Sequence, residues 1–62
     1  MNMFSELVNI GNEVASIWGG YCKRAEIDMQ GQKVNFLCVE RGEEFYTSLS
    51  FDELHRDYNL NI

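Results

Sequence analysis

The run Val34-Asn35-Phe36-Leu37-Cys38-Val39 is the most continuously apolar stretch of the sequence and lies at its middle. Turns that contain glycine flank it, Gln30-Gly31-Gln32 before and Arg41-Gly42-Glu43 after. A short apolar run bounded by turn residues is typical of a buried strand. We therefore expect a central strand that two hairpins join to a neighbouring strand on each side.

The preceding strand is expected to begin near Tyr21, where the hydrophobic period becomes two, the pattern of a half-buried strand. Gly31 can supply the positive φ that a two-residue hairpin loop requires, and that loop is either Gln30-Gly31 or Gly31-Gln32. The apolar positions that this alternation turns toward one face are Ala25, Ile27 and Met29.

The second hairpin has a register that can be compared with the first. A two-residue loop at Arg41-Gly42 turns the apolar residues of both its strands to the face that the first hairpin already uses. A slip by one residue would send them to the other face, so the agreement supports the register. The expected pairs are Cys38 with Phe45, Phe36 with Thr47, and Val34 with Leu49.

Residues 3–18 have the period of an amphipathic helix, which Asn2 can cap and Gly19-Gly20 can end. Gly11 lies in the apolar stripe, where glycine costs about 1 kcal/mol of helix stability relative to alanine. We interpret it as a point where the helix lies close to a large residue of the sheet. The stripe consists of Met3, Phe4, Leu7, Val8, Gly11, Val14, Ala15 and Trp18, with Ile10 and Ile17 on its border.

A second, shorter helix is expected after the third strand. Ser50-Phe51-Asp52-Glu53 matches a capping box, and the helix should run through about Tyr58 and end at Asn59. The sequence thus predicts a single small α+β domain over residues 1–62. Its order is α-β-β-β-α, a three-stranded antiparallel meander with both helices packed on one face.

This order of elements is similar to that of double-stranded RNA-binding domains and of some small phage-encoded inhibitors. The similarity to the RNA-binding domains lacks their motif, because the second helix has no lysine cluster to contact phosphate. Ten acidic residues against five basic ones give a net charge of −5, and Lys23-Arg24 is the only basic pair. Direct nucleic-acid binding is therefore disfavoured. A basic protein surface is the more natural partner, although the same excess of acid also serves solubility.

The residues that could carry chemistry do not form a known pattern. Cys22, Cys38, His55 and Asp52 have spacings that match no zinc signature, and Cys38 is expected to point inward as a small hydrophobic residue. We therefore expect no enzyme activity, no metal and no cofactor. The sequence shows neither a signal peptide nor an apolar run of about 20 residues, so we expect a cytoplasmic protein, in the host if phage-encoded.

The outer face of the predicted sheet is the candidate binding surface. Leu37, Val39 and Tyr46 should form an apolar centre with a mostly acidic rim, as many protein interfaces do. A homodimer through this face or through the edge strand Phe45–Leu49 is an alternative, and so is ordinary exposure of apolar atoms. The candidate protein-binding residues are Leu37, Val39, Tyr46, Glu26, Asp28, Glu43 and Glu44.

The functional hypothesis is a small acidic protein-binding module without catalysis. It could be an inhibitor of host machinery from a phage or mobile element, of the anti-CRISPR or anti-restriction type, whose acidic surface occupies a basic groove. The alternatives are a nucleic-acid-associated module with the topology of double-stranded RNA-binding domains, and a homodimeric structural or adaptor protein.

Overall fold

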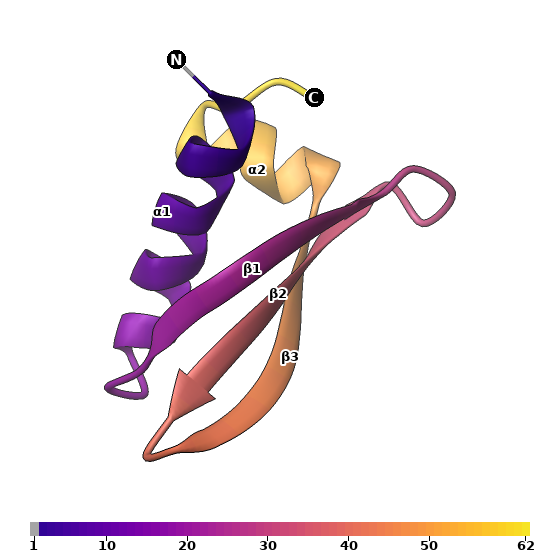
Figure 1. Ribbon diagram of the computed structural model, residues 1–62. Coiled ribbons are helices and arrows are strands. Elements are labelled where there is room, and N and C mark those ends of the chain that lie inside the picture. The colour runs from indigo at the N-terminus through magenta and orange to yellow at the C-terminus, as the bar shows by residue number, and fades with distance from the viewer. Residues whose placement is uncertain (1) are drawn as a thin grey trace.

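The computed structural model describes residues 2–62, and its elements follow the order helix, three strands, helix (Figure 1). The strands form one antiparallel sheet in the order β1-β2-β3. The predicted α+β class, element order and meander are therefore confirmed. The elements are α1 (Met3–Ser16), β1 (Tyr21–Asp28), β2 (Lys33–Glu40), β3 (Glu43–Ser50) and α2 (Phe51–Tyr58).

The predicted register of the second hairpin is confirmed: Val34, Phe36 and Cys38 pair with Leu49, Thr47 and Phe45. The loop between β2 and β3 has positive φ at both Arg41 (51°) and Gly42 (80°). Two successive residues of positive φ are the signature of the type I′ turn, whose twist matches that of the flanking strands.

The first hairpin differs from the prediction. Its loop covers the four residues 29–32, and the positive φ falls on Gln32 instead of Gly31. The Asp28 carboxylate accepts a hydrogen bond from the Gly31 N–H (2.9 Å), which closes a wider turn than the expected two-residue loop. Met29, expected on the inner face, therefore lies in this turn and is 68% exposed.

A β-bulge in β1 decides which of its residues face the helices. Cys22 pairs with Cys38, but Arg24 pairs with Leu37, so Lys23 is an extra residue between the two pairs. The bulge turns Cys22 into the core and Tyr21 outward, against the alternation that the sequence suggests. The side chain of Asn12 on α1 accepts a hydrogen bond from the Cys22 N–H (2.7 Å) and so satisfies a backbone donor at the bulge.

α1 is shorter than predicted, and its buried stripe is narrower. Gly19 has φ +73°, and the Gly20 N–H donates to the Ala15 carbonyl (3.0 Å), which ends the helix before Trp18. Figure 1 shows the N-terminal half of α1 diverging from β1. The expected burial of Met3, Phe4 and Trp18 is therefore wrong, since they are 40%, 55% and 45% exposed. The buried residues of the helix are Leu7, Ile10, Gly11 and Ala15.

Close packing of α1 against the sheet depends on Gly11. A Cβ atom at this position would lie 2.6 Å from the Cys22 Sγ and 2.8 Å from Cδ1 of Phe36. The expectation that Gly11 allows the helix to approach a large sheet residue is thus confirmed, and that residue is Phe36. Phe36 itself is fully buried, and the buried residues of both helices and of β1 and β2 form one cluster.

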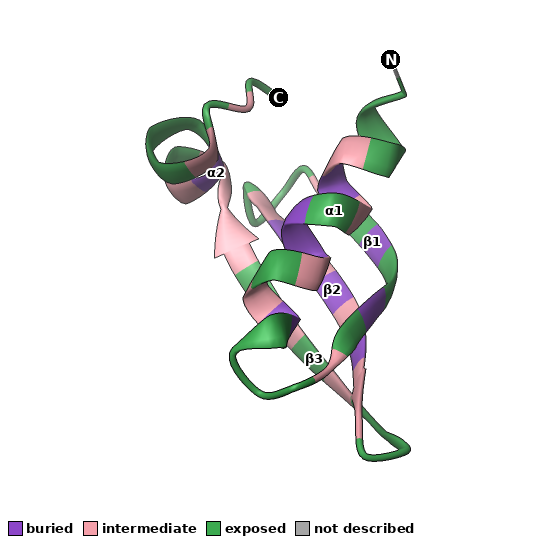
Figure 2. Cartoon of the chain, turned by 90° about the vertical axis from the view of Figure 1, so that its left-hand side faces the viewer, coloured by how far each residue is buried: buried purple, intermediate pink, exposed green. Residues whose placement is uncertain are grey.

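The two helices cover the sheet unequally. α1 packs on β1 and β2, whereas α2 packs at the end of β3 (Figure 2). The predicted capping box is confirmed: Ser50 Oγ accepts from the Glu53 N–H (3.0 Å), and Glu53 Oε1 accepts from the Ser50 N–H (3.1 Å). It directs Leu54 into the common core. β3 has no fully buried residue, so its inner face is only partly covered.

Candidate protein-binding surface

The face of the sheet opposite α1 has an apolar centre. On it Leu37 lies between Arg24 and Tyr46, and Val39 lies between Tyr21 and Glu44. The tyrosines are 55% (Tyr21) and 65% (Tyr46) exposed, and Leu37 and Val39 are half-buried. We call this surface the outer-face patch and define it as Tyr21, Leu37, Val39 and Tyr46.

Three of these four residues were predicted as binding residues, and the register places them side by side. Tyr21 was missed, because strict alternation from Ala25 back along β1 puts it on the inner face. Only the bulge at Lys23 reverses that assignment. A signal was present in the sequence: regular alternation would have left a tyrosine in the core and Cys22 outside it.

Two of the predicted acidic residues lie beside the patch but are already paired. Glu26 Oε1 lies 3.0 Å from Nε of Arg24, and Glu44 Oε2 lies 2.6 Å from Nζ of Lys23. The hydrogen bond from Lys23 lowers the pKa of the Glu44 carboxyl, and the same bond raises the pKa of the Lys23 ammonium. Lys23 crosses β2 to reach Glu44, so the rim is mixed in charge and not predominantly acidic.

The other two predicted acidic residues lie away from the patch. Asp28 stands at the far end of β1, where its carboxylate closes the first turn. Glu43 pairs with Glu40 across the second hairpin, so it is on the inner face, opposite to Glu44. Of the three acids expected on the outer face, Glu26 and Glu44 therefore flank Leu37 and Val39, whereas Asp28 does not.

The basic side chains do not gather into a nucleic-acid site. Within residues 2–62, Lys23, Arg24 and Arg56 each form an ion pair with a carboxylate. The other two lie at opposite ends of β2: Lys33 is its first residue, and Arg41 is in the turn that follows it. A phosphate backbone is held by several cations along one surface, and this arrangement does not provide that. No helix in the described part of the chain has the length and apolar character needed to cross a membrane.

The two cysteines lie opposite each other in the core. Cys22 and Cys38 are cross-strand partners, both are buried, and both are free thiols. The predicted inward position of Cys38 is thus confirmed. His55 is exposed on α2. Residues 2–62 contain no group of three or more histidine, cysteine or acidic side chains that could hold a metal ion.

Burial raises the pKa of the Cys22 and Cys38 thiols above the ordinary value of 9.0. In the unfolded chain these thiols lose their protons first, so their stabilising contribution is complete below pH 9 and is lost as the pH rises through the higher folded values. We expect the free energy of unfolding to fall above pH 9, measured by urea denaturation at several pH values under reducing conditions. The double variant Cys22→Ala/Cys38→Ala should be less stable at pH 7 but should show a shallower alkaline decline. An equally steep decline in both proteins would show that other groups cause it.

Comparisons of the chain with protein-family models, with curated proteins and with solved structures gave no match. The case for function therefore depends on the surfaces of the domain itself.

Proposed function

We propose that this chain is a small protein-binding domain that contacts its partner through the outer-face patch. The observation that carries the proposal is a pair of exposed tyrosines, Tyr21 and Tyr46, around the half-buried Leu37 and Val39. Aromatic residues with an aliphatic centre and a polar rim are the usual composition of the energetic centre of an interface. The mixed rim of Lys23–Glu44 and Arg24–Glu26 fits the polar edge of such a contact.

The net charge of −5 favours a partner with a basic surface, because complementary charge accelerates encounter. In this proposal the domain acts by occupying that surface, as an inhibitor from a phage or mobile element would when it covers a basic nucleic-acid groove. A reducing cytoplasm fits the two opposed free thiols.

The test is a pull-down from bacterial lysate with the tagged domain, with and without nuclease, followed by affinity measurements with the purified partner. Tyr21→Ala/Tyr46→Ala is the informative variant, because both side chains are largely exposed and their loss should leave the fold intact. We expect a stoichiometric protein partner that survives nuclease, and a loss of affinity of at least about thirtyfold in this variant.

The matched control is Phe4→Ala/Met29→Ala, which removes two equally exposed apolar side chains away from the patch. Its affinity should equal that of the wild type. Equal losses in both variants would contradict the proposal. The tagged domain could instead recover only itself and run as a dimer in size-exclusion chromatography with light scattering. That result would contradict partner binding and indicate self-association. A partner lost on nuclease treatment would replace the proposal with nucleic-acid association.

A further inference from the structure

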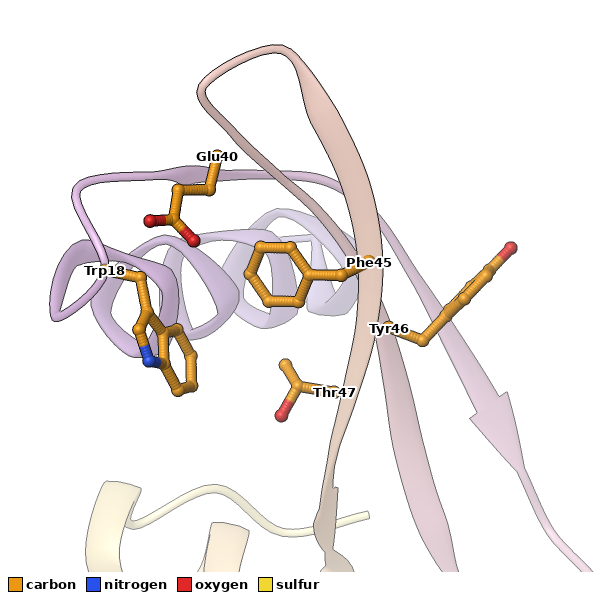
Figure 3. A pocket seen from close by; sticks show the side chains of 5 residues that line it. All are labelled: Trp18, Glu40, Phe45, Tyr46 and Thr47. Atoms are coloured by element: carbon orange, nitrogen blue, oxygen red, sulfur yellow. The ribbon is translucent and has the colours of Figure 1, made fainter.

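The inner face of the sheet contains a hollow, at the place where α1 leaves β3 uncovered. It has a volume of about 310 Å³ and is lined by the end of β2, part of β3 and the turn after α1. In Figure 3 the side chains of Trp18, Phe45 and Glu40 face this hollow, and Tyr46 extends to the other side of β3. The lining residues are Trp18, Glu40, Phe45, Tyr46 and Thr47.

The aromatic wall of the hollow consists of Trp18 and Phe45. Their ring centroids are 5.6 Å apart and their planes meet at 85°, an edge-to-face contact. Trp18 is 45% exposed although it belongs to this contact, so part of its surface is free. The face of an indole ring attracts cations more strongly than that of any other side chain.

The charged wall of the hollow is Glu40, and a second glutamate, Glu43, lies next to it in the sheet. Glu40 and Glu43 are directly opposite each other in the register of β2 and β3, on the face that also carries Phe45. Like charges at such a cross-strand position destabilise a hairpin. Within residues 2–62 neither carboxylate forms an ion pair, although Arg41 lies in the turn between them. The hollow thus combines an open aromatic surface with unneutralised negative charge.

We propose that this hollow binds an arginine side chain of a partner protein. A planar guanidinium group can stack on the Trp18 indole while its N–H groups donate to the Glu40 carboxylate. Lysine fits less well, because an ammonium group is more strongly hydrated and cannot stack. Bound arginine would also relieve the repulsion between Glu40 and Glu43. The inference is independent of the proposed role of the outer-face patch, which lies on the opposite face of the sheet.

The test uses Nα-acetyl-arginine amide as the probe and Trp18 as the reporter, because Trp18 is the only tryptophan of the chain. Its fluorescence is followed during titration at constant ionic strength. We expect a saturable change with a Kd of about 1–50 mM, as suits a single side chain. Nα-acetyl-citrulline amide has the same shape without the charge and should bind at least tenfold more weakly.

Glu40→Gln should weaken arginine binding at least fivefold, and Glu13→Gln, an exposed site on α1, should not change it. The proposal is overturned if the citrulline probe gives an equal response, if arginine produces no saturable change, or if Glu40→Gln binds as the wild type does. These outcomes do not test the outer-face patch, because the stacking and the charge contact are assigned to Trp18 and Glu40. Tyr46 belongs to both sets of residues, but its side chain extends to the other side of β3. The variant Tyr21→Ala/Tyr46→Ala changes only one lining residue of the hollow, Tyr46. The arginine titration can therefore still be interpreted in this variant, even if it has lost partner binding.

Discussion

Replacement of Phe36 by alanine is expected to lower the urea midpoint of the domain by more than half. Phe36 is fully buried on the central strand and is the largest side chain of the core. Truncation of a buried phenylalanine typically costs about 3–5 kcal/mol. A domain of this length has a total stability of roughly 3–9 kcal/mol, so this one change removes about half of it or more. Urea denaturation followed by circular dichroism measures the loss.

Two other variants test the cause of that effect. Phe36→Leu retains most of the volume and should keep the domain folded with a reduced urea midpoint. Tyr46→Ala removes an aromatic side chain of similar size from the neighbouring strand, but at a site that is 65% exposed, so the midpoint should change little. A Phe36→Ala protein that retained more than half of the wild-type midpoint would contradict the assigned core.

Gly11→Val is expected to destabilise the domain by about 3 kcal/mol, because the new side chain has no space. Its Cβ alone would lie 2.6–2.8 Å from Cys22 and Phe36, and both residues are buried. Overpacking of a core costs about 1–3 kcal/mol, and the valine methyl groups add to the conflict. Thermal and urea denaturation measure the change.

Whether Gly11→Ala raises or lowers the urea midpoint tests how closely α1 packs on the sheet. In an open helix this substitution stabilises by about 1 kcal/mol, whereas here the clash should outweigh that gain and lower the urea midpoint. Asn9→Ala, at an exposed position of α1, serves as the control and should stabilise slightly. A Gly11→Ala protein more stable than the wild type would mean that α1 does not lie as close to β1 and β2 as described.

Hydrophobic period and turn residues were sufficient to predict the element order and the second hairpin. The period of two in β2 and β3 continues without interruption, and Arg41-Gly42 allows only one register that keeps the apolar residues together. The ends of α2 were equally predictable, because the Ser50–Glu53 capping box and the left-handed Asn59 are local features of the chain.

Features that depend on contacts between elements were not predictable in this way. The bulge at Lys23 is stabilised by Asn12, ten positions before Cys22, and no local pattern shows that hydrogen bond. The angle between α1 and the sheet decides the exposure of Met3 and Phe4, and periodicity carries no information about that angle. Tyr21 in the patch and the hollow beside Trp18 both follow from such contacts, so the sequence predicted the apolar centre of the outer face but neither of these.

The most direct test of the outer-face patch is a backbone amide NMR spectrum of the ¹⁵N-labelled domain, recorded with and without the partner from the pull-down. We predict that the largest chemical-shift changes fall on Leu37, Val39, Tyr46 and Tyr21, with smaller ones on the exposed face of α1. Changes confined to α1 and α2, with those four residues unaffected, would contradict the claim that the open face of the sheet is the binding surface.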